Sequence, residues 1–354
     1  MSGAASSSPR VRVAFSHTFG DANPYTRLLM ESLAGIGAEI LPFCGRDLVR
    51  RRCDIWHLQW PESVARRTPR RRALDSVVRL FAYLVVARIR RIGIVWTVHN
   101  VQEHELLRPR LDRFVRSVLA RSIHAWISLS DTAADEARDA MPALGGKPCF
   151  VIPHGHYRDA YQQVPPREWA REQLGLPHDA TVVLFFGLIR PYKNVPGLIQ
   201  AFREVALEDW RLIIAGKSDA AQSCDLRRLT EGDSRIRLEL RHIDDEDVPT
   251  LFSAADLVAL PFLRTLNSGS AILGLSFDRP ILVPDQGSMR SLHESVGARW
   301  VTLYQGGIRG QDLERSLARR LPDAEAAPLD HLSWPNIGSM TMSAYLRILA
   351  MLTT

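Results

Sequence analysis

The sequence predicts an α/β protein made of two Rossmann-like, doubly wound domains that face a cleft. With 354 residues, the chain is long enough for two domains of ordinary size. Short apolar runs alternate with longer helical stretches in both halves, and this rhythm favours parallel sheets with helices on both faces. We place the first domain at residues 1–160, the second at 161–332, and a last helix at 333–354 that packs back on the first domain.

Apolar runs of strand length recur through the first domain. The predicted strands lie at 11–16, 54–59, 94–98, 125–129 and 149–152. A helix is expected at 26–34, arginine-rich helical stretches separate the later strands, and residues 1–9 look like a disordered leader. Ligands of such sheets gather at the carboxyl ends of the strands. The His, Asn, Glu and Asp residues that follow these strands are therefore the candidates for a binding site.

The second domain repeats this pattern after Pro165 and Pro166. Helices are expected at 195–205 and 270–277, and another ends at Ala254. The predicted strands lie at 182–186, 211–215, 236–240, 257–260 and 281–283. Strands and helices that alternate in this way predict a second parallel sheet, with its own ligand-binding edge.

The composition sets the class of protein and of partner. Hydrophobic residues make up 46% of the chain and charged residues 24%, which is typical of a soluble protein, and the net charge of +6 favours anionic partners. The four cysteines are scattered, as expected for reduced thiols in the cytosol. No signal-peptide core and no apolar run of roughly 18 residues is present. We therefore expect a cytoplasmic protein, soluble or peripherally bound to a membrane.

A basic stretch at 64–92 surrounds the apolar segment 80–86. A basic amphipathic helix of this kind can lie on an anionic membrane surface. The alternative is a buried helix with solvated arginine ends. No zinc finger, helix-turn-helix or base-stacking signature accompanies the stretch, so we expect no nucleic-acid partner. Its arginines are Arg66, Arg67, Arg70, Arg71, Arg72, Arg79, Arg88, Arg90 and Arg91.

Two segments far apart in the sequence together predict a diphosphate pocket. The first, 186–195, puts two cations just past a strand, and the second, 267–270, opens a helix with small residues. Cations and a helix N-terminus both stabilise phosphates, and glycine lets the backbone approach them. The alternative is a surface loop and a capped helix. The candidate donor-binding residues are Gly187, Arg190, Lys193, Asn267, Ser268, Gly269 and Ser270, with Gly216 and Lys217 after the next strand.

Several further motifs carry a resemblance to a known family. They lie at 23–25, 56–62, 97–100 with 104–105, 154–159, 186–193 and 266–269. With these motifs the chain resembles the glycosyltransferases of the GT-B fold, and more closely the β-mannosyltransferases of xanthan-type polysaccharide assembly, glycosyltransferase family 94. The resemblance covers most of the chain, and only the motif at 186–193 is specific by itself.

The resemblance implies a donor, an acceptor and a stereochemical course. The donor is GDP-mannose, the acceptor is a lipid-diphosphate-linked oligosaccharide of bacterial exopolysaccharide assembly, and the anomeric carbon is inverted. Large retaining GT-B families carry two glutamates beside the phosphate helix, where this chain has Thr265 and Leu273. Their absence argues against retention and leaves the ribose contact open. By analogy, His242 and Ile243 would edge the nucleobase.

An inverting transfer needs a general base for the acceptor hydroxyl. Glu105 and Glu62 rank first and His99 next, with His17, Asp21 and Asp131 behind them. The alternative for either glutamate is a loop carboxylate paired with an arginine, and His99 could instead contact the donor sugar. The acceptor-binding candidates are Asn23, Tyr25, His154 and His156, and the two histidines could instead contact the donor or only order the hinge.

We expect no cofactor and no metal. The acidic run Asp244–Asp247 suits a helix N-terminus, and Arg190 with Lys193 supplies the charge that a metal would bring to the leaving diphosphate. The sequence and the resemblance together predict a metal-independent glycosyltransferase at the inner face of the cell membrane. Its rivals are a transferase using UDP-glucose or UDP-glucuronic acid, a nucleotide-sugar epimerase, and a non-catalytic GT-B-like subunit.

Overall fold

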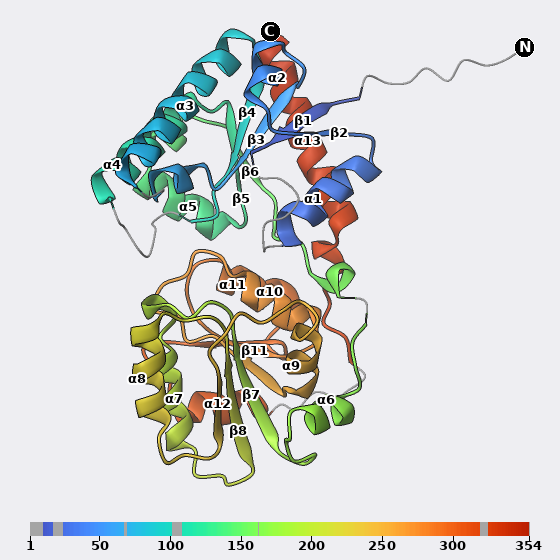
Figure 1. The fold of residues 1–354 in the computed structure, drawn as a ribbon. Helices are drawn as coiled ribbons and strands as arrows, with labels where there is room; N and C mark the ends of the chain where they lie inside the picture. The colour runs from blue at the N-terminus through green and yellow to red at the C-terminus, as the bar shows by residue number, and fades with distance from the viewer. Residues whose placement is uncertain are drawn as a thin grey trace, which may run out of the picture. The chain divides into compact units, whose positions relative to one another are not determined.

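The computed structural model describes residues 10–16, 24–66, 69–100, 108–161, 163–318 and 325–353. Two compact units make up the chain (Figure 1). The first comprises Met1–Gly155 and Leu332–Thr354, and the second comprises His156–His331. Each unit holds one parallel sheet covered by helices, so the prediction of two doubly wound α/β domains is confirmed.

In the described part of the first unit, six parallel strands form the sheet in the order β2-β1-β3-β4-β5-β6. The strand order reverses at β1: β2 lies on one side of β1, and β3 to β6 follow on the other side, as in a doubly wound sheet. The strands are β1 (Arg12–Phe15), β2 (Glu39–Pro42), β3 (Ile55–Gln59), β4 (Gly93–Thr97), β5 (Ala125–Ser128) and β6 (Cys149–Val151).

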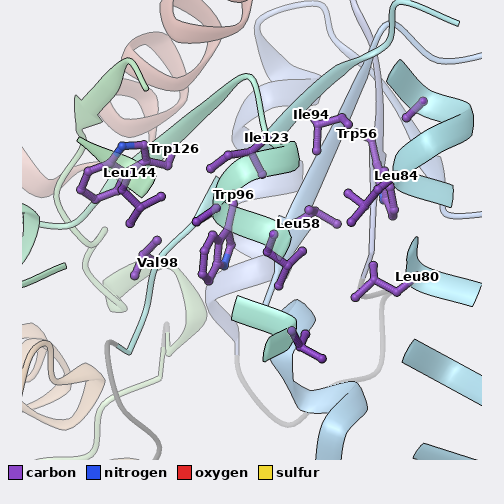
Figure 2. Close-up of a cluster of buried hydrophobic side chains, with 14 of the residues drawn as sticks. Trp56, Leu58, Leu80, Leu84, Ile94, Trp96, Val98, Ile123, Trp126 and Leu144 are labelled. Atoms are coloured by element: carbon purple, nitrogen blue, oxygen red, sulfur yellow. The ribbon is translucent and has the colours of Figure 1, made fainter. Parts of the chain in front are cut away.

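One face of this sheet holds a cluster of buried hydrophobic side chains (Figure 2). Trp96 pairs with Trp126 across β4 and β5, and Trp56 lies on the neighbouring strand β3. All three indoles are buried, and Leu80 and Leu84 of α3 belong to the same cluster. The helices of the unit are α1 (Pro24–Gly35), α2 (Gly45–Val49), α3 (Arg70–Ile89), α4 (Pro109–Ser122), α5 (Asp131–Ala140) and α13 (Trp334–Thr353).

The C-terminal helix α13 packs in the first unit, against α1 and the sheet. Ser32 Oγ donates a hydrogen bond to the carbonyl of Trp334 at 2.5 Å. Gly338 allows this close approach, because a Cβ there would clash with Ser32 Oγ. Ile348 lies over Gly93, where a Cβ would meet its Cγ2 at 3.1 Å. The end of the chain is thereby a structural part of the first unit.

The second unit holds six parallel strands among its described residues, in the order β12-β11-β10-β7-β8-β9. Its helices are α6 (Arg167–Gln173), α7 (Val195–Glu204), α8 (Ala220–Thr230), α9 (Val248–Ala254), α10 (Gly269–Ser276), α11 (Ser288–Val296) and α12 (Gly310–Leu317). Its strands are β7 (Thr181–Phe186), β8 (Trp210–Ala215), β9 (Ile236–Glu239), β10 (Leu257–Ala259), β11 (Ile281–Pro284) and β12 (Val301–Tyr304).

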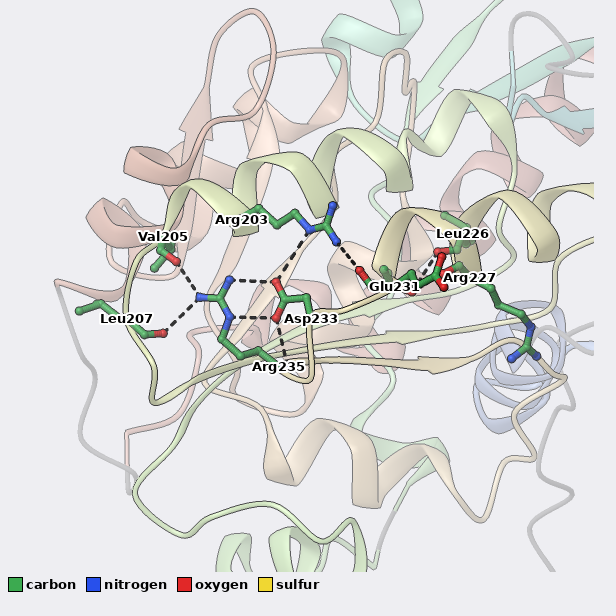
Figure 3. A network of polar contacts seen from close by, with 9 residues as sticks. Arg203, Val205, Leu207, Leu226, Arg227, Glu231, Asp233 and Arg235 are labelled. Atoms are coloured by element: carbon green, nitrogen blue, oxygen red, sulfur yellow. Dashed lines mark hydrogen bonds and ion pairs between the residues drawn. The ribbon is translucent and has the colours of Figure 1, made fainter.

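A network of arginine and carboxylate side chains lies at the amino ends of β8 and β9 (Figure 3). Asp233 accepts two hydrogen bonds from the guanidinium of Arg235, at 2.9 and 3.0 Å, and lies 3.8 Å from Arg203 of α7. Arg235 also donates to the carbonyl of Val205 at 2.7 Å. Ligands of parallel sheets gather at the opposite, carboxyl ends of the strands. We therefore assign this network a structural role.

Two strands of the structure were absent from the sequence prediction, β2 and β12. Both lie at sheet edges. The residues of β2 are exposed or half-buried throughout, so they give no apolar run. Position at an edge does not explain the omission of β12, because the edge strands β6 and β9 were predicted. The residues of β12, Val-Thr-Leu-Tyr, carry an ordinary strand signal that the prediction missed.

Candidate functional site

The turn after β7 is shaped by Gly187. Its φ of +128° is unfavourable for any residue with a side chain, and its amide donates to the carbonyl of Ala215 at 3.0 Å. A Cβ at Gly187 would meet Lys193 Nζ at 2.9 Å and Ser270 Oγ at 3.0 Å. An amine from one predicted segment and a hydroxyl from the other therefore converge over one α-carbon.

Lys193 lies in a short 3-10 turn, Pro191–Lys193, just before α7. Its amine lies 5.4 Å from the centre of the Phe262 ring, and the carbonyl of Tyr192 accepts from the amide of Leu263 at 2.8 Å. Burial, and secondarily Arg190, lower the pKa of Lys193 to about 8. Two cations held close together in a half-buried place favour an anion beside them.

The second segment forms the N-terminus of α10. Ser268 is the N-cap residue, and its Oγ accepts a hydrogen bond from the amide of Ala271 at 3.2 Å. Gly269 and Ser270 occupy the first positions of the helix, whose backbone amides have no partner within the helix. The helix dipole adds positive potential there. The diphosphate hypothesis therefore has a cation, a hydroxyl and a helix N-terminus in one place.

The turn after β8 supports the turn after β7. Gly216 has a φ of +152°, and a Cβ there would run into the carbonyl oxygen of Gly187. The carbonyl of Lys217 accepts from the amide of Ile189 at 2.9 Å, while its side chain is exposed. Gly216 thus lets the two turns pack together, and Lys217 presents its amine to solvent.

The remaining donor-side candidates lie around this centre in different settings. Arg190 is half-buried, and its Nη1 donates to the carbonyl of Ile189 at 3.0 Å. The carbonyl of Asn267 accepts from Thr265 at 3.1 Å. His242 is exposed, 3.9 Å from Asp244, and Ile243 beside it is buried. Their nucleobase role remains a hypothesis.

In the first unit, His99 follows β4 and is held on three sides. Its Nε2 lies 2.6 Å from Gln59 Oε1. Its ring stacks on Trp60 with centres 4.0 Å apart and planes at 14°, and the ring of Tyr25 meets it edge-on at 5.2 Å. His154 lies 4.6 Å from Tyr25, and burial lowers the pKa of His154 to about 4. Tyr25, His99 and His154 thus form one aromatic cluster.

Glu62 is placed differently from the other candidate bases. It is 1% exposed and lies 3.6 Å from Arg116 of α4, which is itself held by Asp112 at 2.8 Å. Arg116 also donates to the carbonyl of Asn100 at 2.7 Å. This is the arginine-paired alternative raised by the sequence, and a buried pair of this kind suits a structural role.

The remaining candidates are either not described by the structure or lie elsewhere among the described residues. Glu105, Asn23, His17 and Asp21 lie outside the described residues. His156 belongs to the second unit, where burial lowers its pKa. The boundary between the units falls between Gly155 and His156, and a Cβ at Gly155 would clash with the indole of Trp334. Asp131 is exposed at the start of α5.

Sequence reasoning gave no functional role to His57, Gln59, Thr97 and Tyr345, which form a buried polar network next to His99. Burial lowers the pKa of His57 to about 3, so this imidazole is neutral. A signal existed, because His57 and Gln59 alternate with apolar residues along β3 and polar residues inside a buried strand need partners. Tyr345, on the last helix, could not be connected to them by pattern.

Comparisons with known proteins agree with the fold. The family model "Glycosyl transferases group 1" matches residues 166–273. Sucrose-phosphate synthase from Thermosynechococcus elongatus superposes with a TM-score of 0.69 over 97% of this chain and 100% of its own, at 16% identity. Alr3699/HepE from Anabaena, solved with UDP, gives 0.63 over 98% of each chain at 15% identity. In the described residues, no helix combines the length and apolarity needed to cross a membrane.

Another comparison shows similarity to a relative along nearly the whole chain. It is the GDP-mannose:glycolipid 4-beta-D-mannosyltransferase of Xanthomonas campestris pv. campestris, which is 31% identical over 98% of this chain and 95% of its own length. A D-inositol 3-phosphate glycosyltransferase of Mycobacterium bovis is 30% identical, over 60% of this chain and 47% of its own. The chain therefore belongs to the family of the Xanthomonas mannosyltransferase and is a glycosyltransferase of the GT-B fold.

Proposed function

We propose that this enzyme transfers mannose from GDP-mannose to a glycolipid acceptor, a lipid-diphosphate-linked oligosaccharide, with inversion at the anomeric carbon. Similarity to the Xanthomonas enzyme over 98% of the chain supports the donor and the acceptor class. The absence of glutamates at Thr265 and Leu273 supports inversion. The proposal places this transfer in bacterial exopolysaccharide assembly, as the resemblance of the sequence motifs implies.

The observation that carries this proposal is the convergence of Lys193 Nζ and Ser270 Oγ over Gly187 at the N-terminus of α10. As the bond between the mannose and the diphosphate of the donor breaks, negative charge grows on the nucleoside diphosphate. A cation, a hydroxyl and helix amides aimed at one point stabilise that charge without a metal. Arg190 adds a second cation beside Lys193.

The first unit supplies the acceptor side of the reaction. A general base must take the proton of the attacking hydroxyl. Three candidate bases lie among the described residues: His99 lies in an aromatic cluster with Tyr25 and His154, Glu62 is buried against Arg116, and Asp131 is exposed at the start of α5. We therefore assign the base role to His99 for this proposal. Glu105 lies outside the described residues and remains the alternative.

A basic and apolar surface on the first unit fits the membrane in which a glycolipid resides. Leu74, Val78, Val85 and Ile89 form an exposed stripe on α3, and half-buried Phe81 on the same face contacts exposed Phe114 of α4. Val78 is 67% exposed and Ile89 74%. We call these six residues the α3–α4 ridge. Their spacing places the α3 members on one face of that helix.

Exposed arginines lie on the same two helices as the α3–α4 ridge and just after α3. Across the described residues of α3 and α4, Asp75 is the one exposed acidic side chain. Arginine beside an apolar stripe matches the interface of a bilayer with anionic headgroups, where each basic residue contributes about 1 kcal/mol. The surface arginines are Arg70, Arg71, Arg72, Arg79, Arg88, Arg90, Arg91, Arg110, Arg113 and Arg121.

The first experiment is a nucleotide thermal shift without added metal, followed by transfer assays with a lipid-diphosphate-linked oligosaccharide. GDP should stabilise the protein by about 2.7 kcal/mol at a hundred times its dissociation constant, and UDP and ADP should not. The variant Lys193→Met should lose the GDP response, whereas Lys147→Met, in the first unit, should keep it. Stabilisation by UDP alone would show that the donor is a UDP-sugar and not GDP-mannose. A protein that responds to no nucleotide would be a non-catalytic subunit.

A further inference from the structure

Next to His99 lies a chain of polar side chains that runs from β3 and β4 to the C-terminal helix α13. His57 Nδ1 lies 2.6 Å from Tyr345 Oη, and Gln59 Nε2 lies 3.1 Å from His57 Nε2. Thr97 Oγ1 lies 2.7 Å from His57 Nε2 and 3.4 Å from Gln59 Nε2. His57, Gln59 and Tyr345 are 0% exposed and Thr97 is 1% exposed. The network is therefore closed to solvent, and its hydrogen bonds determine one another.

The direction of the hydrogen bonds follows from the chemistry of the groups. His57 is neutral, because burial lowers its pKa to about 3, so one ring nitrogen donates and the other accepts. The amide nitrogen of Gln59 only donates, which makes His57 Nε2 the acceptor. The His57 proton is then on Nδ1 and is donated to Tyr345 Oη.

The other end of the Gln59 amide faces His99. A carbonyl oxygen only accepts, and Gln59 Oε1 lies 2.6 Å from His99 Nε2. The proton of His99 is consequently on Nε2. In neutral imidazole the remaining nitrogen, Nδ1, then carries the lone pair. His57 and His99 are thus held in opposite tautomers by the two ends of one amide.

The ring of His99 is also fixed in orientation. It stacks on Trp60, and Trp60 has a φ of +44°, a conformation that bulky residues rarely adopt. Backbone strain of this kind costs about 1–3 kcal/mol and clusters at functional sites. The backbone of Gln59 is held as well, since its amide donates to Ser16 Oγ at 2.9 Å. The stacking on Trp60 and the hydrogen bond to the Gln59 side-chain amide together leave the imidazole of His99 little freedom to rotate.

We propose that Gln59 is a positioning residue that holds His99 in a single tautomer, with the proton on Nε2 and the lone pair on Nδ1. This role rests on the proposed function, in which His99 accepts the proton of an acceptor hydroxyl. Nδ1 is the atom that takes this proton while the hydroxyl oxygen bonds to the anomeric carbon and the nucleoside diphosphate departs. The resulting imidazolium keeps its first proton on Nε2 and still donates it to Gln59 Oε1.

The test has a readout that does not depend on turnover. In protein labelled with ¹⁵N-histidine, the wild type should show His99 as the Nε2–H tautomer and His57 as the Nδ1–H tautomer, with signals assigned through His99→Asn. His124 provides an internal reference, because its Nδ1 accepts from the amide of Ile94 at 2.9 Å. Gln59→Leu should turn the His99 signal into a mixture of tautomers. A wild-type His99 with its proton on Nδ1, or an unchanged signal in Gln59→Leu, would overturn the proposal.

Kinetics then separate positioning from folding. Gln59→Leu should lower kcat at least about tenfold, since general-base catalysis as a whole contributes about 10²–10⁴-fold, and should leave the affinity for GDP unchanged. Thr341→Val is the matched control: it removes a buried hydroxyl of α13 that bonds to the carbonyl of Ile337 at 2.7 Å, and it should leave both the tautomers and kcat unchanged. If Gln59→Leu does not fold, Gln59→Asn withdraws the carbonyl from His99 and should produce the same tautomer mixture.

The outcomes also distinguish this inference from the proposed function. A protein that transfers no mannose but shows the two opposite tautomers would refute the proposed reaction and keep the network. Transfer of mannose by a Gln59→Leu variant with wild-type kcat would refute the positioning role and keep the reaction.

Discussion

The amine of Lys193 lies over the α-carbon of Gly187, 2.9 Å from the point where any larger residue would carry its Cβ. The side chain at 187 therefore controls where the cation can lie. Ser270 Oγ is 3.0 Å from the same point, so a single methyl group would push apart the two groups that we assign to the diphosphate.

The variant Gly187→Ala should consequently lose GDP affinity by at least about tenfold, or 1.4 kcal/mol. Its backbone, at a φ of +128°, should also cost about 1–3 kcal/mol of stability. Gly175→Ala is the matched control, with a φ of +63° and no atom within 4 Å of the added Cβ. Calorimetric titration of both variants checks this prediction. Equal GDP affinity in the two would remove Lys193 and Ser270 from the phosphate site.

The affinity for GDP should fall as the pH rises through about 8. Burial, with a smaller effect of Arg190, lowers the pKa of Lys193 from 10.5 to about 8, so the free protein loses this charge above that pH. The diphosphate binds the charged form, and affinity should decline up to tenfold per pH unit once the free amine is neutral. Titrations from about pH 7 to about pH 9 check this. The slope should be absent in Lys193→Met.

The same lysine should affect the stability of the free protein in the opposite direction. The unfolded chain binds the Lys193 proton up to about pH 10.5, whereas the folded chain releases it near pH 8. Between these values the unfolded state holds more protons, so the contribution of Lys193 to the free energy of unfolding rises with pH. Denaturant unfolding of the wild type and Lys193→Met over this window checks the sign. Parallel pH profiles would contradict the lowered pKa.

Glu62→Gln should damage stability more than catalysis. Glu62 and Arg116 are 1% and 4% exposed, and removing one charge of a buried pair typically costs about 3–5 kcal/mol. The remaining bonds of Arg116 to Asp112 and Asn100 should hold the loss near the lower end of that range. Denaturant unfolding and kcat per folded molecule measure the two effects. A large loss of kcat at unchanged stability would restore Glu62 as a candidate base.

Much of the donor side could be predicted from the sequence because its signals are local. The apolar run 182–186 becomes β7, and the small residues at 268–270 cap and begin α10. Parallel topology then brings the carboxyl ends of the strands to one edge, and the two segments meet over Gly187.

The acceptor side was harder to predict from the sequence because its contacts depend on long-range packing. Glu62 follows a strand as a catalytic carboxylate would, yet its neighbour in space is Arg116 of α4. His57 bonds to Tyr345, which lies on the last helix. Neither partner has a sequence spacing that a pattern could detect, and burial, which decides the role of each group, follows only from the assembled sheet and helices.

Membrane binding should depend on the α3–α4 ridge. The double variant Val78→Glu with Ile89→Glu puts two carboxylates on its most exposed apolar positions, where they lose apolar burial and repel anionic headgroups. Binding to phosphatidylcholine vesicles that contain phosphatidylglycerol should fall at least about tenfold, a loss of 1.4 kcal/mol. Leu207→Glu is the control, since Leu207 is 47% exposed in the second unit. For the wild type, binding should also weaken with salt, because the arginine contribution is screened. Wild-type binding by the double variant would move the membrane contact away from α3.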